Sequence, residues 1–253
     1  MIPFFQFNTI SLGGISIQVW GTFVALGILI GMWTSARFAK KRGLDAEHVY
    51  DAAFWIILFA FIGARIVHIL FYDLNFYASH PAEIIAIWHG GFSVIGGFIG
   101  SIVAFILYTK RKRLNWLNYV DPFIYGLPIG LACGRIGCFL IHDHPGTATD
   151  FFLGVKNQSG VGSFHDHGLY LSLNGLALAI VFYLLSKKPR SAGFFAQVFL
   201  IWYGVVRFTL DFWRKVDATY FGVTPAQYVS FAMVLGGIIW IMKSKQTPPI
   251  TIS

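Results

Sequence analysis

Three arginines stand inside runs of this chain that are otherwise apolar: Arg65, Arg135 and Arg207. The guanidinium group of arginine is a planar fork of hydrogen-bond donors that fits the oxygens of a phosphate group. Arg135 lies in "CGRIGC", between small residues that leave room around such a fork. A charge inside an apolar segment is costly and usually functional, although an arginine near a helix end can also simply reach the lipid headgroups. Three such arginines indicate a site for a phosphate group. If their apolar segments lie in a membrane, the phosphate available to them is that of a phospholipid headgroup.

Groups that can carry protons follow Arg135 closely, as His142, Asp143 and His144. Because a histidine ring exchanges protons near neutral pH, His142 and His144 are candidates for a general base, and His89 is a third. Asp143 can orient a neighbouring ring or a histidine from another loop, since adjacent side chains point in different directions. For any one of these histidines, a structural role at the membrane interface is the alternative interpretation.

A polar stripe runs along the stretch "YGVVRFTLDFWR". Spacings of four, four and three residues place its members on one face of a helix, and these members are Tyr203, Arg207, Asp211 and Arg214. Arg207 and Asp211 can form an ion pair with each other, which is the simplest explanation for the presence of both charges. A polar stripe on a helix rich in Val, Phe and Trp nevertheless predicts a lined interior.

Two glycine pairs occur in "HGGFSVIGGFIG", Gly90-Gly91 and Gly96-Gly97. Glycine lets the backbone approach a ligand or a neighbouring helix closely. Close helix packing is therefore the alternative to a binding role for this block.

Two other kinds of protein share some of these features. A zinc-dependent membrane hydrolase would use metal-compatible side chains, here Cys138, His142, Asp143, His144, His165, Asp166 and His167. No His-Glu-x-x-His or paired Cys-x-x-Cys spacing supports it, so we expect no metal. An anion or lipid transporter could use the arginines, but no inverted repeat is recognisable. Cys133 and Cys138 lie five positions apart on one helix end, so no disulfide is expected.

The composition indicates which elements position these residues. The chain has 253 residues, of which 56% are hydrophobic and 12% charged. Several runs lack charge for about 17–20 residues, long enough to cross a bilayer as a helix. We therefore expect an all-α integral membrane protein with seven spans, at about 18–37, 52–72, 92–109, 118–140, 170–186, 193–213 and 226–242. No cationic region precedes the first run, which favours a membrane helix over a cleaved signal peptide.

The basic residues predict the orientation of the chain. Thirteen of the 19 Lys and Arg residues follow the first, third, fifth and seventh spans, and such clusters mark cytoplasmic ends. The N-terminus is then outside and the C-terminus cytoplasmic, with one membrane domain at 1–242 and a tail at 243–253. Nucleic acid is not expected as a partner. All three intramembrane arginines, and seven of the eight histidines, fall toward the outer side, which predicts a shared outward-facing cavity.

Several of these blocks, in this order, resemble the prolipoprotein diacylglyceryl transferase family. "VWGTFVALGILIG" and "GARIVHILFY" look like the first two helices of that family, and "WHGGFSVIGGFIG" looks like its glycine-rich block. "GRIGCFLIHDHPGTATD" looks like the signature built on Gly-Arg-x-Gly-Asn-Phe. "YGVVRFTLDFWRKVD" and "TPAQYVSFAMVLGG" look like the last two helices.

The resemblance implies an inner-membrane transferase with a site facing the periplasm or the cell exterior. Such enzymes move a diacylglyceryl group from phosphatidylglycerol to the lipobox cysteine of a prolipoprotein signal peptide, and glycerol phosphate leaves. No cofactor is implied, and we expect a monomer.

The resemblance also assigns residues. Arg135 matches the signature arginine and Arg207 the arginine of the sixth helix, while Arg65 matches that of the second helix. The catalytic candidates are therefore Arg135 and Arg207, together with the possible bases His142, His144 and His89 and with Asp143 as a group that orients a histidine. The expected substrate-binding residues are Arg65, Tyr203, Asp211, Arg214, Gln227, Tyr170, Gly90, Gly91, Gly96, Gly97 and Cys138.

The chain also departs from the family pattern. Ile95 stands where the glycine-rich block normally has a histidine, Cys138 replaces the signature asparagine, and Asp143 replaces the signature glutamate. The motif His-Pro-Ser-Gln-Leu-Tyr-Glu is reduced to "HDHGLYL", with Leu171 in place of its glutamate. The phosphate-binding arginines are thus present while the proton-handling groups are changed, so the base has moved or the acceptor differs.

Overall fold

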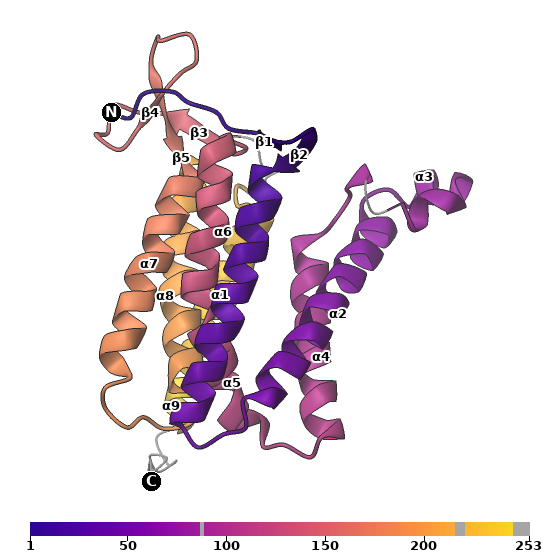
Figure 1. Ribbon diagram of the computed structural model, residues 1–253, viewed down its shortest axis with the longest axis vertical. Coiled ribbons are helices and arrows are strands. Elements are labelled where there is room, and N and C mark those ends of the chain that lie inside the picture. Colours follow the sequence, from indigo (N-terminus) through magenta and orange to yellow (C-terminus); the bar gives the residue numbers. More distant parts are fainter. Residues whose placement is uncertain (87–88, 216–220, 245–253) are drawn as a thin grey trace. The chain divides into compact units, whose positions relative to one another are not determined.

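The computed structural model describes residues 1–86, 89–215 and 221–244 (Figure 1). The chain divides into two compact units, each described by itself. The first unit combines Met1–Gly43 with Val120–Ser253, and the second is Leu44–Tyr119.

The first unit is built on long apolar helices that lie side by side in Figure 1. They are α1 (Val19–Lys41), α6 (Leu127–Ile141), α7 (His167–Leu185), α8 (Phe194–Leu210) and α9 (Pro225–Ser244). Helix α6 packs against α1 on one side and α7 on the other, and α8 packs against α9. A cluster of buried aromatic and aliphatic side chains closes the interior, and it comprises Phe38, Leu178, Phe182, Phe195 and Phe199.

Glycines allow the close approach of α1 and α6. A Cβ atom on Gly27 would lie 2.5 Å from the carbonyl oxygen of Gly130, and one on Gly31 would lie 3.1 Å from that of Gly126. Helix association in lipid depends on such small residues, because the hydrophobic effect does not drive apolar helices together there.

Short strands lie at one end of these helices, beside the N-terminal segment (Figure 1). β1 (Thr9–Leu12) and β2 (Ile15–Gln18) form an antiparallel hairpin before α1. Between α6 and α7 lie β3 (Pro145–Ala148), β4 (Val155–Lys156) and β5 (Ser163–Asp166), in the antiparallel order β3-β5-β4. The sequence analysis did not anticipate these strands, because their few residues carry no clear alternating pattern.

The second unit is a helix pair. Helices α2 (Glu47–Phe71) and α4 (Val94–Arg111) pack together, and α3 (Leu74–Ser79) and the 3₁₀-helix η1 (Pro81–Ile84) lie between them in the chain. A Cβ atom on Gly63 would lie 2.5 Å from the carbonyl oxygen of Gly96. The second glycine pair thus begins where α4 packs on α2, in agreement with the packing interpretation of that block.

Six helices of the described residues are long and apolar enough to cross a membrane, at Val19–Lys41, Glu47–Phe71, Trp116–Ile141, His167–Leu185, Phe194–Trp213 and Pro225–Ser244. They match six of the seven expected spans, which makes the chain a mostly helical, multi-pass membrane protein. Helix α4 occupies the remaining position, 92–109, but its crossing stays a prediction, as does the orientation of the termini. Helix α9 extends to Ser244, and the rest of the expected tail lies outside the described residues.

The span at 118–140 is interrupted at Gly126. Helix α5 (Trp116–Tyr125) ends one residue before Gly126, and α6 begins at Leu127 with Pro128 in its first turn. Proline is tolerated there because the first N–H groups of a helix have no intrahelical acceptor.

Candidate active site

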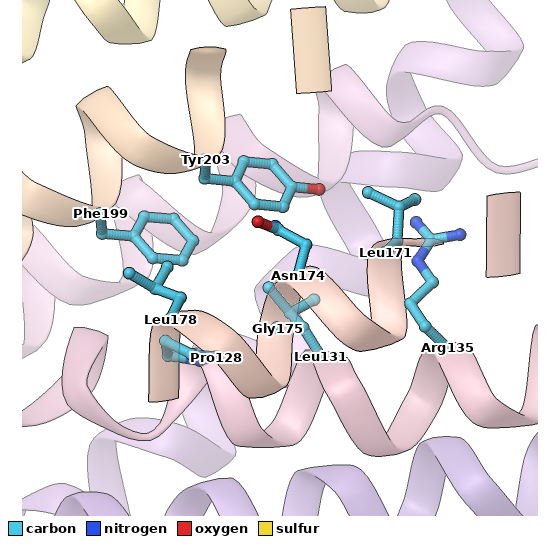
Figure 2. A pocket seen from close by; sticks show the side chains of 9 residues that line it. All are labelled: Pro128, Leu131, Arg135, Leu171, Asn174, Gly175, Leu178, Phe199 and Tyr203. Carbon is cyan, nitrogen blue, oxygen red and sulfur yellow. The ribbon is translucent and has the colours of Figure 1, made fainter. Parts of the chain in front are cut away.

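Arg135 lines a narrow cavity between α6, α7 and α8 (Figure 2). Its other polar lining residues are Asn174 on α7 and Tyr203 on α8, and the remaining lining is apolar apart from Gly175. Figure 2 shows the guanidinium group of Arg135 and the hydroxyl group of Tyr203 toward the same end of the cavity. The cavity volume is about 10 Å³, which is room for about one water molecule.

Small residues of α6 explain why Arg135 faces this cavity. A Cβ atom on Gly137 would lie 2.8 Å from that of Phe23, so this face of α6 is pressed against α1. Arg135 is half-buried, and its Nη1 lies 3.8 Å from Sγ of Cys138 one turn later. This weak contact is the one hydrogen bond of Arg135 within the described part of the chain, so the guanidinium retains donors for a ligand.

Arg207 is paired, as the spacing allowed. Its Nη1 lies 3.0 Å from Oδ1 of Asp211, and Nη1 of Arg214 lies 3.6 Å from the same oxygen. The hydroxyl group of Thr224 donates to the other oxygen of this buried carboxylate. Asp211 therefore joins the end of α8, where the 3₁₀-helix η3 (Asp211–Trp213) begins, to the start of α9.

Gln227 makes contacts at the same junction between α8 and α9. It is 2% exposed, its Oε1 accepts from the backbone of Thr224 at 3.0 Å, and its Nε2 donates to Phe208 O at 3.3 Å. These contacts are those of a helix-start residue, and a substrate contact for Gln227 stays a prediction.

Arg65 in the second unit is 6% exposed and surrounded by backbone carbonyl groups. Its guanidinium donates to the carbonyl oxygens of Glu83, Ile84, Ala86, Gly90 and Gly91. Gly90 and Gly91 both have positive φ angles, 82° and 79°, which glycine adopts without strain. Arg65 thus fixes the loop before α4, and its expected phosphate contact stays a prediction.

His142 lies at the C-cap of α6 with φ 50° and ψ 45°. Its Nδ1 donates to Oδ2 of Asp166 at 2.6 Å, and its side chain is 3% exposed. The aromatic rings of Phe4, Phe5, Phe139 and Phe164 surround it. Nε2 is buried and has no hydrogen-bond partner among the described residues, a situation that costs about 1–3 kcal/mol unless a ligand or water bonds to it.

The other candidate bases are more exposed. Nδ1 of His144 lies 2.8 Å from Oδ1 of Asp143, so Asp143 orients its neighbour and not His142. Nδ1 of His89 lies 2.7 Å from Oε2 of Glu83, in the second unit. None of these histidines lines the cavity of Arg135.

His165 and Tyr170, which the reduced family motif retains, contact each other. Nδ1 of His165 lies 2.9 Å from the Tyr170 hydroxyl, and its ring stacks on that of Trp213 at 5.2 Å. Burial lowers the pKa of the His165 ring below its ordinary value, because the charged form loses solvation.

The fold brings together Arg135 and Tyr203 in one cavity and places Arg207 one helical turn beyond Tyr203. Sequence reasoning missed Asn174, whose Oδ1 accepts from Trp202 Nε1 at 2.8 Å. The sequence feature that could have pointed to Asn174 is that it is a lone amide side chain within the apolar run of α7. It also missed Asp166 as the partner of His142, because the two are 24 positions apart and only the strand β5 brings them together.

The described residues contain no group of three or more His, Cys, Asp or Glu side chains placed to hold a metal ion. Both cysteines are free, as their spacing predicted.

Apolar helices long enough to span a membrane, three of which enclose a cavity lined by Arg135, define an integral membrane protein. The family model for prolipoprotein diacylglyceryl transferase matches residues 8–243, so the chain belongs to that transferase family, as its motifs indicated.

Proteins named phosphatidylglycerol–prolipoprotein diacylglyceryl transferase are similar over nearly the whole chain. That of Methylobacillus flagellatus is 33% identical over 252 residues, covering 95% of this chain and 96% of the relative. That of Cupriavidus necator is 32% identical, covering 98% and 95%. That of Nitrosomonas europaea is 33% identical, covering 93% and 88%.

Proposed function

We propose that this enzyme transfers a diacylglyceryl group from phosphatidylglycerol to the thiol of the lipobox cysteine in a prolipoprotein. The family match over residues 8–243 carries the proposal. The half-buried Arg135 in a cavity between spanning helices supports it, because a membrane-embedded guanidinium suits a lipid phosphate.

The reaction forms one bond and breaks one. The cysteine sulfur bonds to the glyceryl carbon that bears the phosphate, and the bond from that carbon to the phosphate oxygen breaks. The thiol proton passes to a base, and glycerol phosphate leaves with the electrons of the broken bond. The enzyme must hold the growing charge on the leaving phosphate and accept the thiol proton.

Arg135 is our candidate for holding the phosphate, with Tyr203 and Asn174 as neighbouring polar groups. A diacylglyceryl phosphate is far larger than a cavity of about 10 Å³, so the side chains that line it must move to admit the substrate. Arg207 lies one turn beyond Tyr203, but its ion pair with Asp211 must loosen or be shared before it binds phosphate.

His142, His144 and His89 all stay candidates for the base that accepts the thiol proton. His142 has the geometry of an oriented base, because Asp166 holds its Nδ1 and leaves Nε2 unpaired. Against it, His142 lies on a different cavity from Arg135.

The proposed setting is the bacterial cytoplasmic membrane, with a monomeric enzyme whose strands face outward. In the first unit, basic residues lie in the last turns of α1 and α9 and just after α7, at the end of the helices opposite the strands (Figure 1). Such residues favour the cytoplasmic side.

One assay tests the reaction. The purified protein is incubated with phosphatidylglycerol and a lipobox peptide, and mass spectrometry follows the peptide. We expect the mass of one diacylglyceryl thioether on the cysteine, and no product on the same peptide with serine in its place. Release of glycerol phosphate without modified peptide would point to a diverged enzyme with another acceptor.

A further inference from the structure

A second and larger cavity lies at the strand end of the first unit. Its volume is about 390 Å³, and it shares no lining residue with the cavity of Arg135. Its walls come from the N-terminal segment, the C-cap of α6, the strands β3 and β5, the loop after β4, and Lys215. A volume of this size fits a small molecule.

His142 lines this cavity, and its ring carries an unsatisfied nitrogen. Its Nδ1 is fixed by Asp166, while Nε2 is buried and has no partner in the described structure. A ring held on one side by a carboxylate and unpaired on the other is prepared to share a proton with a ligand.

The charge of the residues that line the cavity indicates which kind of ligand it binds. Among the described residues that line the cavity, Lys215 is the one ionisable side chain apart from the His142 ring, and none is a carboxylate. Among the described ion pairs, the acid in contact with His142 is Asp166, which lies on the Nδ1 side of the ring. The amide side chains of Gln6, Asn157 and Gln158 add hydrogen-bonding groups. Such a site favours an anion that can both accept and donate hydrogen bonds.

We propose that this cavity binds a phosphate monoester or the phosphate of a lipid headgroup, with Nε2 of His142 and Nζ of Lys215 as its anchors. A phosphate monoester gains or loses a proton close to neutral pH. For a monoester, the hydrogen bond to Nε2 therefore forms whether the ring or the phosphate carries the shared proton. Glycerol phosphate, the leaving group of the proposed reaction, has this chemistry, but the binding itself does not depend on that reaction. The phosphodiester of a lipid headgroup only accepts, so there Nε2 must be the donor.

Isothermal titration calorimetry with glycerol phosphate and with inorganic phosphate tests the site, on the full chain in phosphatidylcholine nanodiscs. We expect saturable binding that Lys215→Gln weakens about tenfold, the usual cost of losing a charge-assisted hydrogen bond. Lys215 is exposed, so this change keeps the fold. Lys156→Gln is the matched control, since Lys156 is exposed on β4 and does not line the cavity.

His142→Asn provides an independent readout, because asparagine tolerates the left-handed backbone at this position but removes Nε2. It should also weaken binding about tenfold. Equal affinities in wild type, Lys215→Gln and His142→Asn would overturn the proposal.

A second arm separates the two sources of phosphate. Native mass spectrometry of protein from phosphatidylglycerol nanodiscs should show a retained lipid that Lys215→Gln loses, if the headgroup is the ligand. Binding of neither soluble ester nor lipid in a Lys215-dependent manner contradicts the inference.

Arg135→Gln distinguishes this inference from the proposed function. The variant should lose transferase activity and keep phosphate binding at the second cavity. If it loses the binding as well, the phosphate occupies the cavity of Arg135, and the second site is disproved.

Discussion

Arg135 gives the sharpest test at the residue scale, because its charge can be kept while its shape is changed. Arg135→Lys retains a cation but loses the planar fork of donors that binds two phosphate oxygens at once. We expect the rate to fall about 10²–10³-fold, as for other donors placed against a developing charge. Initial rates in the thioether assay measure it.

Arg37→Lys is the control for that substitution. Arg37 is exposed on α1, packs over the ring of Trp33 at 4.1 Å, and does not line the cavity. If Arg135→Lys turned over near the wild-type rate, the proposed binding of phosphate by Arg135 would be wrong.

His142 and His144 should differ when each is replaced by alanine. His142→Ala removes the buried partner of Asp166, so we expect at least a tenfold loss of rate, the low end of general-base contributions. His144 is 43% exposed in its side chain and contacts only its neighbour Asp143 among the described ion pairs, so His144→Ala should be nearly silent.

Thermal unfolding of both alanine variants separates catalysis from folding. A His142→Ala protein that melts like wild type and turns over slowly supports a role in the reaction. If both variants are silent while Arg135→Lys is inactive, His89→Ala is the next test of the base.

The lowered pKa of His165 predicts a pH effect on stability. The unfolded chain takes up the proton at a higher pH than the folded chain, so the free energy of unfolding falls as the pH drops below the ordinary histidine pKa toward the folded value. The melting temperature should therefore be lower at pH 5 than at pH 8. His165→Gln should reduce this difference, and an unchanged difference would contradict the argument.

At the scale of the elements, apolar runs without charge predicted the helices to within a few residues. The expected span 52–72 is α2, at Glu47–Phe71, and 226–242 is α9, at Pro225–Ser244. Apolar length suffices for this because every backbone group in lipid must be bonded within the segment. The strands β3 to β5 escaped prediction because their order depends on pairing with distant segments, such as the bridge from Gly146 to Arg214.

A buried ion pair fixes the other end of the first unit. The carboxylate of Asp121 is 0% exposed, lies 2.9 Å from Nη1 of Arg42, and accepts from the backbone N–H groups of Gly193 and Ala196 at the start of α8. Asp121→Asn leaves a buried guanidinium without its counter-charge. We expect the free energy of unfolding to fall by about 3–5 kcal/mol, measured by denaturation in mixed micelles.

Glu47→Gln controls for the loss of a carboxylate, since Glu47 is exposed at the start of α2. It should change the free energy of unfolding by less than about 0.5 kcal/mol. Equal stability of the two variants would show that the Arg42–Asp121 pair contributes little.

At the scale of the whole molecule, the family and its transferase chemistry followed from the order of several short motifs, and the match over residues 8–243 confirms them. The different roles of the three arginines could not be predicted from these motifs. Arg65, Arg135 and Arg207 look alike in sequence, yet one holds five carbonyl groups, one lines a cavity and one pairs with an aspartate. These differences arise from backbone carbonyl positions and distant partners, which no local pattern reports.

The orientation of the chain is the last prediction, and single cysteines test it in a background without Cys133 and Cys138. Ala82, Lys112 and Asp150 are exposed positions for the new cysteines. With an impermeant maleimide on intact cells, we expect labelling at Ala82→Cys and Asp150→Cys, while Lys112→Cys reacts only after permeabilisation. The physical reason is that Lys112 lies in a cluster of four cations, which remains on the cytoplasmic side. Opposite accessibility of Ala82 and Lys112 would also establish that α4, which lies between them, crosses the membrane as the seventh span. Labelling of Lys112 but not Asp150 in intact cells would place the strands inside and reverse the proposed outward site.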